Sequence, residues 1–532
     1  MVHKIRENLD RAEKLLRWGK VHEAQELVDT LSKMEGITPD IILSSKLIRG
    51  KISVKQGRFQ DTQELAEEVL KECSHDRKTY YSVDALVLLA EASWRTGRLD
   101  EGLTYIREGE EILNEIGGEK KRETQQRKGE LLYQKGIISS RKGQLDEALE
   151  FLTESLSFRK KIGNNPYGVG EALNSIGVTY FYMGLLEKAL KVYLASLEIK
   201  KNLGNIQQLA IAYNNIGDLF FVQGELKSAE IYYQRSLKLF QDTGNKEHIS
   251  NAIHNVGKLY HHQGEFDQAL GHLEKALSIA EELGNNISIS ENLYHLIHVA
   301  LDKNDPDLSQ KYFQYLQQIV DTIDNPIVQQ RFQVAEALIL KSKERIRSKM
   351  KALELLGDII RGERVNHELT IAAMLHSCDL LLFELRIYGE DEILLEVKEI
   401  AKQLLEIASE QAQHSLLAET YLLQSRLSMI ELDIENAQEL LSKAYSIAEK
   451  RGLSKLANTI AHEKDLLPKW EKIIDQHPDM KDTTELTQVD DLVQRMIHKK
   501  VPKSEREIKN YVLEAKELLE AWQKGRDQKR AF

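Results

Sequence analysis

The sequence predicts an all-α protein in which pairs of helices stack into a solenoid, and three observations carry this prediction. The 532 residues include only 7 prolines and 30 glycines, while 42% are hydrophobic and 30% are charged, which is typical of helices joined by short turns. Glycines recur at a fixed period through the middle of the chain. All seven prolines fall where this period places turns or linkers, because proline is excluded from helix interiors.

Three series of glycines define the repeating unit. Gly-Asn pairs start at Gly163, Gly204, Gly244 and Gly284, at steps of 41, 40 and 40 residues. A second series consists of Gly143, Gly184, Gly224 and Gly264, and a third lies seven residues before it at Gly136, Gly177, Gly217 and Gly257. We interpret each unit as a helix A, a turn at the second series, a helix B and a turn at the Gly-Asn pair, because a left-handed glycine commonly ends a helix.

The third series lies inside the predicted helix A, where glycine costs about 1 kcal/mol relative to alanine. We expect this cost where the neighbouring helix crosses so closely that a Cβ atom would clash. The small residues expected on the opposing helix B are Ala189, Ala229 and Ala269, opposite Gly177, Gly217 and Gly257. Since no single pair of helices can bury its apolar stripe alone, the pairs must stack on one another.

The order Leu173-x2-Ile176-Gly177-x2-Tyr180 and then Ala189-x3-Tyr193 resembles the tetratricopeptide repeat (TPR), here lengthened from 34 to about 40 residues. The 40-residue form, with neighbouring asparagines in helix A, is similar to the repeats of kinesin light chains and of the Pins-type spindle-orientation adaptors. The resemblance implies a right-handed superhelical solenoid whose helices A line the concave face.

Outside the central repeats the pattern weakens but continues, which gives roughly eleven helical pairs in all. We expect degenerate TPR-like repeats over 1–124, four strong repeats over 125–290 and degenerate repeats again over 291–470. A polar linker with a short helix follows over 471–503, and a C-terminal helix with a basic tail over 504–532. This last helix either caps the final repeat or docks on another molecule, and capping is the simpler expectation.

The sequence contains no motif that indicates catalysis. It has no phosphate-binding Gly-x4-Gly-Lys-Ser/Thr loop, no Gly-x-Gly-x2-Gly, no Cys-x2-Cys and no Gly-x-Ser-x-Gly. We therefore predict no catalytic residue, no cofactor and no metal. The net charge of −11 argues against nucleic acid or an anionic membrane as the partner. The short apolar runs, the charged N-terminus and the presence of only two cysteines favour a cytoplasmic protein.

A groove that binds a peptide is the more specific functional hypothesis. With the packing glycine as the eighth residue of a unit, the fifth, ninth and twelfth residues of helix A should face inwards. The predicted groove residues, including neighbours of these positions, are Asn174, Val178, Phe181, Tyr182, Asn214, Asn215, Asp218, Phe221, His254, Asn255, Lys258, His261 and His298. An asparagine can both donate to and accept from a peptide backbone, and the aromatic rings would form apolar pockets. In related TPR proteins such asparagines hold peptides. The alternative is that they cap or bridge neighbouring helices.

Five of the sixteen histidines also fall on adjacent predicted helices A. They are His254, His261, His262, His295 and His298. Imidazole is a common ligand of zinc and nickel, but the sequence forces no acidic or cysteine ligand onto the same spot, so a solvated or peptide-contacting patch is favoured. If these rings contact a peptide, its binding should weaken below about pH 6.5.

These observations favour a non-enzymatic adaptor that binds a peptide segment or partner protein in the concave groove. The alternative from another class is a peptide-sensing regulatory protein whose repeats switch an output partner, although residues 1–60 already read as repeats and show no DNA-binding domain. An enzyme hidden in the degenerate C-terminal half is a third interpretation. Self-association through the terminal repeats is also compatible with the pattern.

Overall fold

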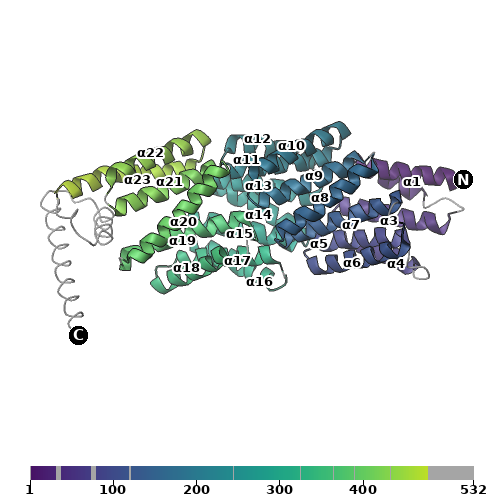
Figure 1. Cartoon of the computed structure of the whole chain (residues 1–532), viewed down its shortest axis with the longest axis horizontal. Helices are drawn as coiled ribbons and strands as arrows, with labels where there is room; N and C mark the ends of the chain where they lie inside the picture. Colours follow the sequence, from purple (N-terminus) through teal and green to yellow (C-terminus); the bar gives the residue numbers. More distant parts are fainter. Residues whose placement is uncertain are drawn as a thin grey trace. The chain divides into compact units, whose positions relative to one another are not determined.

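The computed structural model describes residues 2–476 except 32–36, 74–78, 119–120, 164, 244, 324, 363–364, 389 and 432. Over these ranges every regular element is a helix, and the helices succeed one another as stacked pairs (Figure 1). Twenty-three helices form eleven pairs followed by a last helix, α23, which confirms the predicted solenoid of about eleven repeats. The C-terminal helix predicted over 504–532 and most of the predicted linker lie outside the described residues.

The odd-numbered helices are helices A and the even-numbered helices up to α22 are helices B. Helices A are α1 (Val2–Arg17), α3 (Pro39–Lys55), α5 (Tyr80–Arg95), α7 (Arg122–Arg141), α9 (Pro166–Tyr182), α11 (Ile206–Val222), α13 (Lys246–Gln263), α15 (Asn286–Asp302), α17 (Pro326–Lys341), α19 (His367–Tyr388) and α21 (His414–Ile430). Helices B are α2 (Val21–Leu31), α4 (Phe59–Glu72), α6 (Leu99–Ile116), α8 (Leu145–Ile162), α10 (Leu186–Leu203), α12 (Leu226–Thr243), α14 (Phe266–Glu282), α16 (Pro306–Val320), α18 (Ile346–Arg361), α20 (Asp391–Glu410) and α22 (Ile434–Arg451). The last helix is α23 (Ser454–Gln476).

The chain divides into two compact units, Met1–His376 (unit 1) and Ser377–Phe532 (unit 2), and the division falls within α19. In unit 2, Arg426 of α21 joins two helices through ion pairs to Glu463 of α23 at 2.6 Å and to Asp379 of α19 at 3.1 Å. None of the described helices is long and apolar enough to cross a membrane.

The Gly-Asn pairs have two roles where the sequence suggested one. Gly204 ends α10 in the left-handed conformation, with φ +66°. Asn205 then begins α11, because its side-chain oxygen accepts a hydrogen bond from the backbone N–H of Gln208 at 3.0 Å. Asn245 and Asn285 cap the following helices A in the same way. The pair therefore closes helix B and opens the next helix A.

The prolines agree with the prediction at four positions and disagree at one. Pro39, Pro166, Pro306 and Pro326 each begin a helix, where the missing N–H is not needed. The prediction that every proline lies in a turn or linker is wrong for Pro468, which lies inside α23. Its ring is exposed there, while Ile460 and Leu467 of the same helix are buried. The burial of this apolar face holds the helix through the proline. Pro478 and Pro502 lie outside the described residues.

The packing glycines lie where a side chain would collide with helix B, but not with the residues we expected. A Cβ atom on Gly177 would lie 2.5 Å from the ring of Tyr193, and one on Gly217 would lie 2.7 Å from the ring of Tyr233. On Gly257 it would lie 2.8 Å from Leu273. The bulky residue of helix B, and not the alanine four residues earlier, is therefore the nearest neighbour of each glycine. The alanines Ala189, Ala229 and Ala269 are fully buried.

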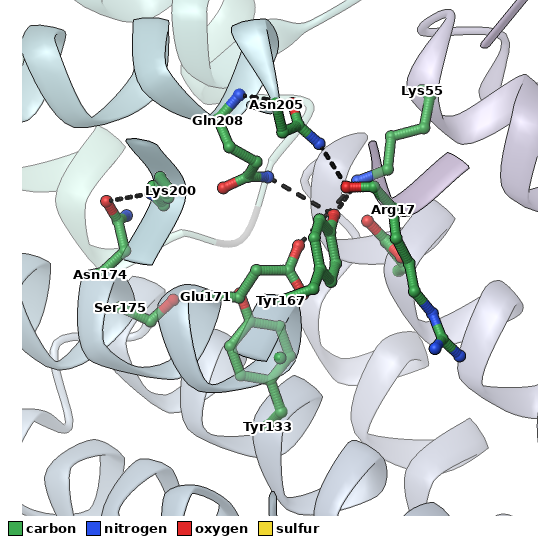
Figure 2. Close-up of polar contacts among 12 residues, drawn as sticks. Arg17, Lys55, Tyr133, Tyr167, Glu171, Asn174, Ser175, Lys200, Asn205 and Gln208 are labelled. Atoms are coloured by element: carbon green, nitrogen blue, oxygen red, sulfur yellow. Dashed lines mark hydrogen bonds and ion pairs between the residues drawn. The ribbon is translucent and has the colours of Figure 1, made fainter. Parts of the chain in front are cut away.

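Within unit 1 the superhelix winds so tightly that its successive turns touch. The side-chain amide of Asn205 donates to the backbone oxygen of Arg17 at 2.7 Å, although 188 residues separate them (Figure 2). Asn245 donates in the same way to the backbone oxygen of Lys55, also at 2.7 Å and 190 residues away. Farther along, the A–B turns at Gly97 and Gly143 approach Ile287 and Val365, since a Cβ atom on these glycines would lie 3.8 Å and 2.9 Å from those side chains. We call this line of contacts between turns the seam.

Candidate functional site

The interior of unit 1 contains a cavity of about 310 Å³, which we call the chamber. Its walls come mainly from the helices A α1, α3, α5, α7, α9, α11 and α13, as expected for the concave face of a TPR solenoid. Six cations line it, namely Arg17, Lys51, Lys55, Arg95, Arg127 and Arg159. Five carboxylates line it as well, namely Glu13, Asp84, Glu91, Glu130 and Glu171. The chamber is therefore strongly polar and nearly balanced in charge.

The charges of the chamber are held in ion pairs between neighbouring helices. Lys51 of α3 lies 2.6 Å from Glu13 of α1, and its positive charge lowers the pKa of that carboxyl group. In the next repeats Arg127 pairs with Asp84 at 2.6 Å and Arg159 with Glu130 at 2.8 Å. The first two pairs join neighbouring repeats and fix the position of one helical pair relative to the next, whereas Arg159 of α8 and Glu130 of α7 belong to the same repeat.

Two pairs reach across the chamber to repeats that are distant in sequence. Arg95 of α5 contacts Glu91 on its own helix and Glu247 of α13, at 3.1 Å each. Lys55 of α3 donates to the hydroxyl of Tyr167 of α9 at 3.0 Å, and Gln208 of α11 donates to the same oxygen at 3.5 Å (Figure 2). These contacts and the seam join the first three repeats to the fifth and later ones.

The two tyrosines of the chamber keep their hydroxyl protons. Burial, with a further contribution from Glu171, raises the pKa values of Tyr133 and Tyr167 well above their usual range. The hydroxyl group of Tyr133 lies 3.2 Å from that of Ser175, and the guanidinium of Arg159 lies 4.1 Å from the centre of the Tyr133 ring. The rings thus offer neutral polar groups and apolar faces between the ion pairs.

Of the predicted groove residues, Asn174 is the one that also lines the chamber. Its side-chain oxygen accepts hydrogen bonds from Lys200 at 2.9 Å and from Asn215 at 3.1 Å. Lys200 comes from helix B α10 and is only 1% exposed, and this burial lowers its pKa to about 7. Asn174 therefore connects the chamber wall to a buried polar network.

The other asparagines join neighbouring helices A through Asp218. Asn255 of α13 donates to Asp218 of α11 at 2.8 Å and to Asn214 at 3.1 Å. Asn214 donates to the second oxygen of Asp218 at 3.1 Å, and Tyr233 donates to the first at 2.8 Å. Burial raises the pKa of Asp218 to about 7, against the opposing effects of Lys258 and Tyr233. The bonds are those expected for the bridging alternative, and peptide contact by this row stays a prediction.

The apolar members of the predicted groove pack against the polar row. Val178 and Phe181 are half-buried against a core that includes Tyr193 and Ile216. Phe221 is buried, with the ammonium of Lys258 4.8 Å from its ring centre. The rings of Phe181 and Tyr182 lie edge to face, with centres 6.0 Å apart. None of these side chains is fully exposed to solvent.

The histidines form a connected row on α13 and α15. His254 lies 2.9 Å from the side-chain oxygen of Asn292 and its ring centre is 4.9 Å from that of His295, which in turn is 6.4 Å from His298. His261 contacts Asp302 at 2.5 Å. Burial lowers the pKa values of His254 and His295, so these two rings become protonated only below pH 6.5. The described residues contain no group of three or more potential ligands placed to hold a metal ion.

The charged residues of the chamber were missed in the sequence, although a signal for them exists. If the residue at the packing-glycine position is the eighth of each unit, the thirteenth is basic in all of the first four units. These residues are Arg17, Lys55, Arg95 and Arg141, in the last turns of α1, α3, α5 and α7, and the first three of them line the chamber. The degenerate N-terminal repeats hide this ladder, because Gly136 and Gly50 have alanines in their place at residues 12 and 90.

The fold and the chamber define the class of the protein as a TPR solenoid, and comparison with known families agrees. A family described as the MalT-like TPR region matches residues 164–456, and the tetratricopeptide repeat family matches residues 129–162. Because the first match spans more than half of the chain, the protein belongs to the MalT-like TPR family. The TPR prediction is confirmed, while the closer similarity to kinesin light chains and Pins-type adaptors stays a prediction.

A comparison with curated proteins found no match. Among solved structures, the chain is similar to a Rap protein complexed with Competence and Sporulation Factor, at 15% identity and a TM-score of 0.48 over 77% of this chain and 99% of that one. NprR in complex with its cognate peptide NprX matches at 18% identity and 0.48, over 66% and 99%. The Rap conjugation gene regulator of the plasmid pLS20 in complex with the Phr* peptide matches at 15% and 0.42, over 71% and 96%.

Proposed function

We propose that the protein is a non-enzymatic binding protein that holds an extended peptide segment of a partner in the chamber of unit 1. The observation that carries the proposal is the cavity of about 310 Å³ on the concave side of the solenoid. Its volume is at the lower end of the range for ligand sites in proteins, about 300–1,000 Å³. It therefore fits a few residues of a peptide and not a folded domain.

The chemistry of the walls supports a peptide as the ligand. The carboxamides of Asn174, Gln207 and Gln208 provide donors and acceptors that match a peptide backbone. Tyr133 and Tyr167 supply aromatic faces for apolar side chains. Binding without catalysis is supported by the ion pairs, because the carboxylates Glu13, Asp84 and Glu130 are each engaged by a cation.

Of the predicted row of asparagines and aromatic residues, Asn174 lines the chamber and would contact the peptide there. The row from Asn214 to Asn255 connects to Asn174 by way of Asn215 and stiffens the wall of the chamber. We propose that the row also extends the binding surface towards α15. The experiment on this point compares the affinity for the peptide in the wild type and in the double variant Asn214→Ala/Asn255→Ala, under conditions in which both proteins are fully folded.

A regulatory role is the second candidate, and the division of the chain favours it. The chamber belongs to unit 1, whereas unit 2 carries its own exposed apolar residues, Ile387, Tyr388 and Leu395. A peptide-sensing protein needs separate surfaces of this kind, one for the signal and one for the output partner. We further propose that the output partner is a protein. The two free cysteines are compatible with the cytoplasmic setting that we propose. We also propose that the chain self-associates through its terminal repeats, which sedimentation would measure.

The experiment that tests the peptide proposal fills the chamber. Ile137 lines the chamber, and Ile137→Trp places a large ring inside it. The matched control is Ile231→Trp, because Ile231 is 50% exposed on α12. Wild type and control should select the same peptides from a random heptapeptide library, and Ile137→Trp should lose them at an unchanged melting temperature. Equal selection by both variants would place the peptide site outside the chamber.

A further inference from the structure

Four cations occupy the same position in four successive helices A, but their surroundings differ. Arg17 lies 3.6 Å from Glu13, Lys55 lies 3.0 Å from the hydroxyl of Tyr167, and Arg95 contacts two carboxylates. Arg141, the fourth, has no hydrogen bond and no ion pair with any residue that the structure describes, and its contact is with the ring of Trp94. It is half-buried at the end of α7.

The guanidinium of Arg141 is held in place by an aromatic platform. Its central carbon lies 4.5 Å from the ring centre of Trp94, and the central carbon of Arg95 lies 4.5 Å from the same ring. The indole itself is fixed, because its N–H donates to the side-chain oxygen of Gln134 at 2.8 Å in a buried contact. Two guanidinium groups therefore stack on one immobile ring.

Arg141 does not itself line the chamber, but it contacts Trp94, which does. It follows Ile137 by one helical turn on α7, and both Ile137 and Trp94 line the chamber. Burial lowers the pKa of Arg141, and the neighbouring charge of Arg95 acts in the same direction, while Glu247, Glu291 and Tyr182 oppose it from α13, α15 and α9. Both of these carboxylates already have a cation, since Glu247 lies 3.1 Å from Arg95 and Glu291 lies 3.4 Å from Arg331.

A half-buried cation without a partner is costly, and an incoming anion removes that cost. A guanidinium that stacks on a ring keeps the N–H groups at its edge available, and their fork matches the two oxygens of a carboxylate. We propose that Arg141 is the anchor for a carboxylate of the peptide bound in the chamber. This inference rests on the proposed function. The carboxylate comes either from the C-terminus of the peptide or from an aspartate or glutamate side chain.

The test uses three sets of random synthetic heptapeptides and measures affinity by fluorescence anisotropy. The first set has a free C-terminus and no acidic side chain, the second has an amidated C-terminus with aspartate or glutamate, and the third is amidated with asparagine or glutamine in their place. We expect binders in the first or the second set, which identifies the source of the carboxylate, and affinities about 10- to 100-fold lower in the third.

The variant Arg141→Met keeps the length of the side chain and removes its charge. It should lower the affinity of carboxylate-bearing peptides by about 10- to 100-fold and leave that of the third set unchanged. The control is Arg235→Met, because Arg235 also lies over a ring, that of Tyr232 at 5.9 Å, but is exposed on α12. It should bind all sets as the wild type does.

Stability separates ligand binding from a structural role. Without ligand, Arg141→Met should melt at the same temperature as the wild type or higher, because it removes a half-buried charge that no carboxylate of the described residues pairs with. A lower melting temperature, unchanged affinity in Arg141→Met, or equal binding of the third set by the wild type would each overturn the inference while the peptide proposal stands. If no set binds to the wild type, the proposed function fails and the inference fails with it.

Discussion

At the scale of single residues, the packing glycines show how one side chain on helix B dictates its neighbour on helix A. The ring of Tyr193 occupies the space where a Cβ atom on Gly177 would lie, at a distance of 2.5 Å. The corresponding distance at Gly136, which faces Leu152, is 2.7 Å. Because real Cβ contacts are longer than 3 Å, a larger residue at these glycines forces the helices apart.

We therefore predict that Gly177→Ala destabilises the protein by about 2 kcal/mol, because overpacking against Tyr193 outweighs the better helix propensity of alanine. The control is Gly271→Ala in α14, where nothing lies within 4 Å of the added atom. It should stabilise the protein by about 0.5–1 kcal/mol. Urea unfolding followed by circular dichroism measures both changes, and effects of the same sign would contradict the explanation.

At the scale of helices and turns, one asparagine can serve two elements at once. The oxygen of Asn205 caps α11, while its amide group satisfies the last backbone oxygen of α1. Asn245 does the same for α13 and α3. The close fit extends to Gly19, where a Cβ atom would lie 2.8 Å from the Asn205 oxygen. A turn between repeats is therefore also a joint between turns of the superhelix.

Substitution by alanine should separate the two roles. Asn285→Ala removes a cap alone, because Asn285 bonds to Ser288 and to no earlier turn of the described chain, and it should cost about 1 kcal/mol. Asn205→Ala and Asn245→Ala remove the cap and the seam bond, and each should cost about 1 kcal/mol more. Hydrogen exchange should rise at the ends of α1 and α3 only in the last two variants. An equal loss of unfolding free energy in all three variants would show that the seam bonds do not stabilise the protein.

At the scale of the whole molecule, buried histidines make stability depend on pH. Burial lowers the pKa of His248 to about 4 and also lowers those of His254 and His295. Between the ordinary value of 6.5 and these lower values the unfolded chain binds more protons than the folded one, so the three histidines destabilise the fold as pH falls. Asp218 and Glu419, whose pKa values burial raises to about 7, act in the opposite direction between about pH 4 and 7.

The contribution of one histidine can be isolated by substitution. Relative to the wild type, His248→Gln should gain about 2 kcal/mol in unfolding free energy when the pH is lowered from 7.5 to 5, because it removes the proton that the unfolded chain takes up. The control is His22→Gln, since the His22 side chain is 88% exposed. It should follow the wild type across the same range. If the unfolding free energy of His248→Gln varied with pH in parallel with that of the wild type, His248 would not be a source of the pH dependence.

The sequence was sufficient for those parts of the fold that depend on neighbouring repeats. The helical pairs and the turns at the Gly-Asn pairs could be predicted, because each contact involves residues within about 40 positions. The seam and the chamber could not, because the partners of Arg17 and Arg95 lie 188 and 152 residues away. Their contact depends on the pitch of the superhelix, which accumulates from small rotations in every repeat and leaves no local signal.

The candidate site shows the same limit at the level of individual side chains. The asparagines of helices A could be identified as unusual from their recurrence, but the pattern alone left bridging and peptide contact open. The structure places Asn214 and Asn255 in bonds between helices. The basic ladder from Arg17 to Arg141 was visible in principle, yet it becomes regular only when the degenerate repeats are aligned on their packing residues.

The seam has a consequence for how the protein is made. Arg17 and Lys55 leave the ribosome before Asn205 and Asn245, with 188 and 190 residues between the members of each bond. At about 5–20 residues per second, the first two repeats remain without these partners for roughly 10–40 s of synthesis. Local stacking alone shapes them during that interval. Arrival of the sixth and seventh repeats, which Asn205 and Asn245 begin, then closes the first superhelical turn, so the chamber forms only when most of unit 1 has been synthesised.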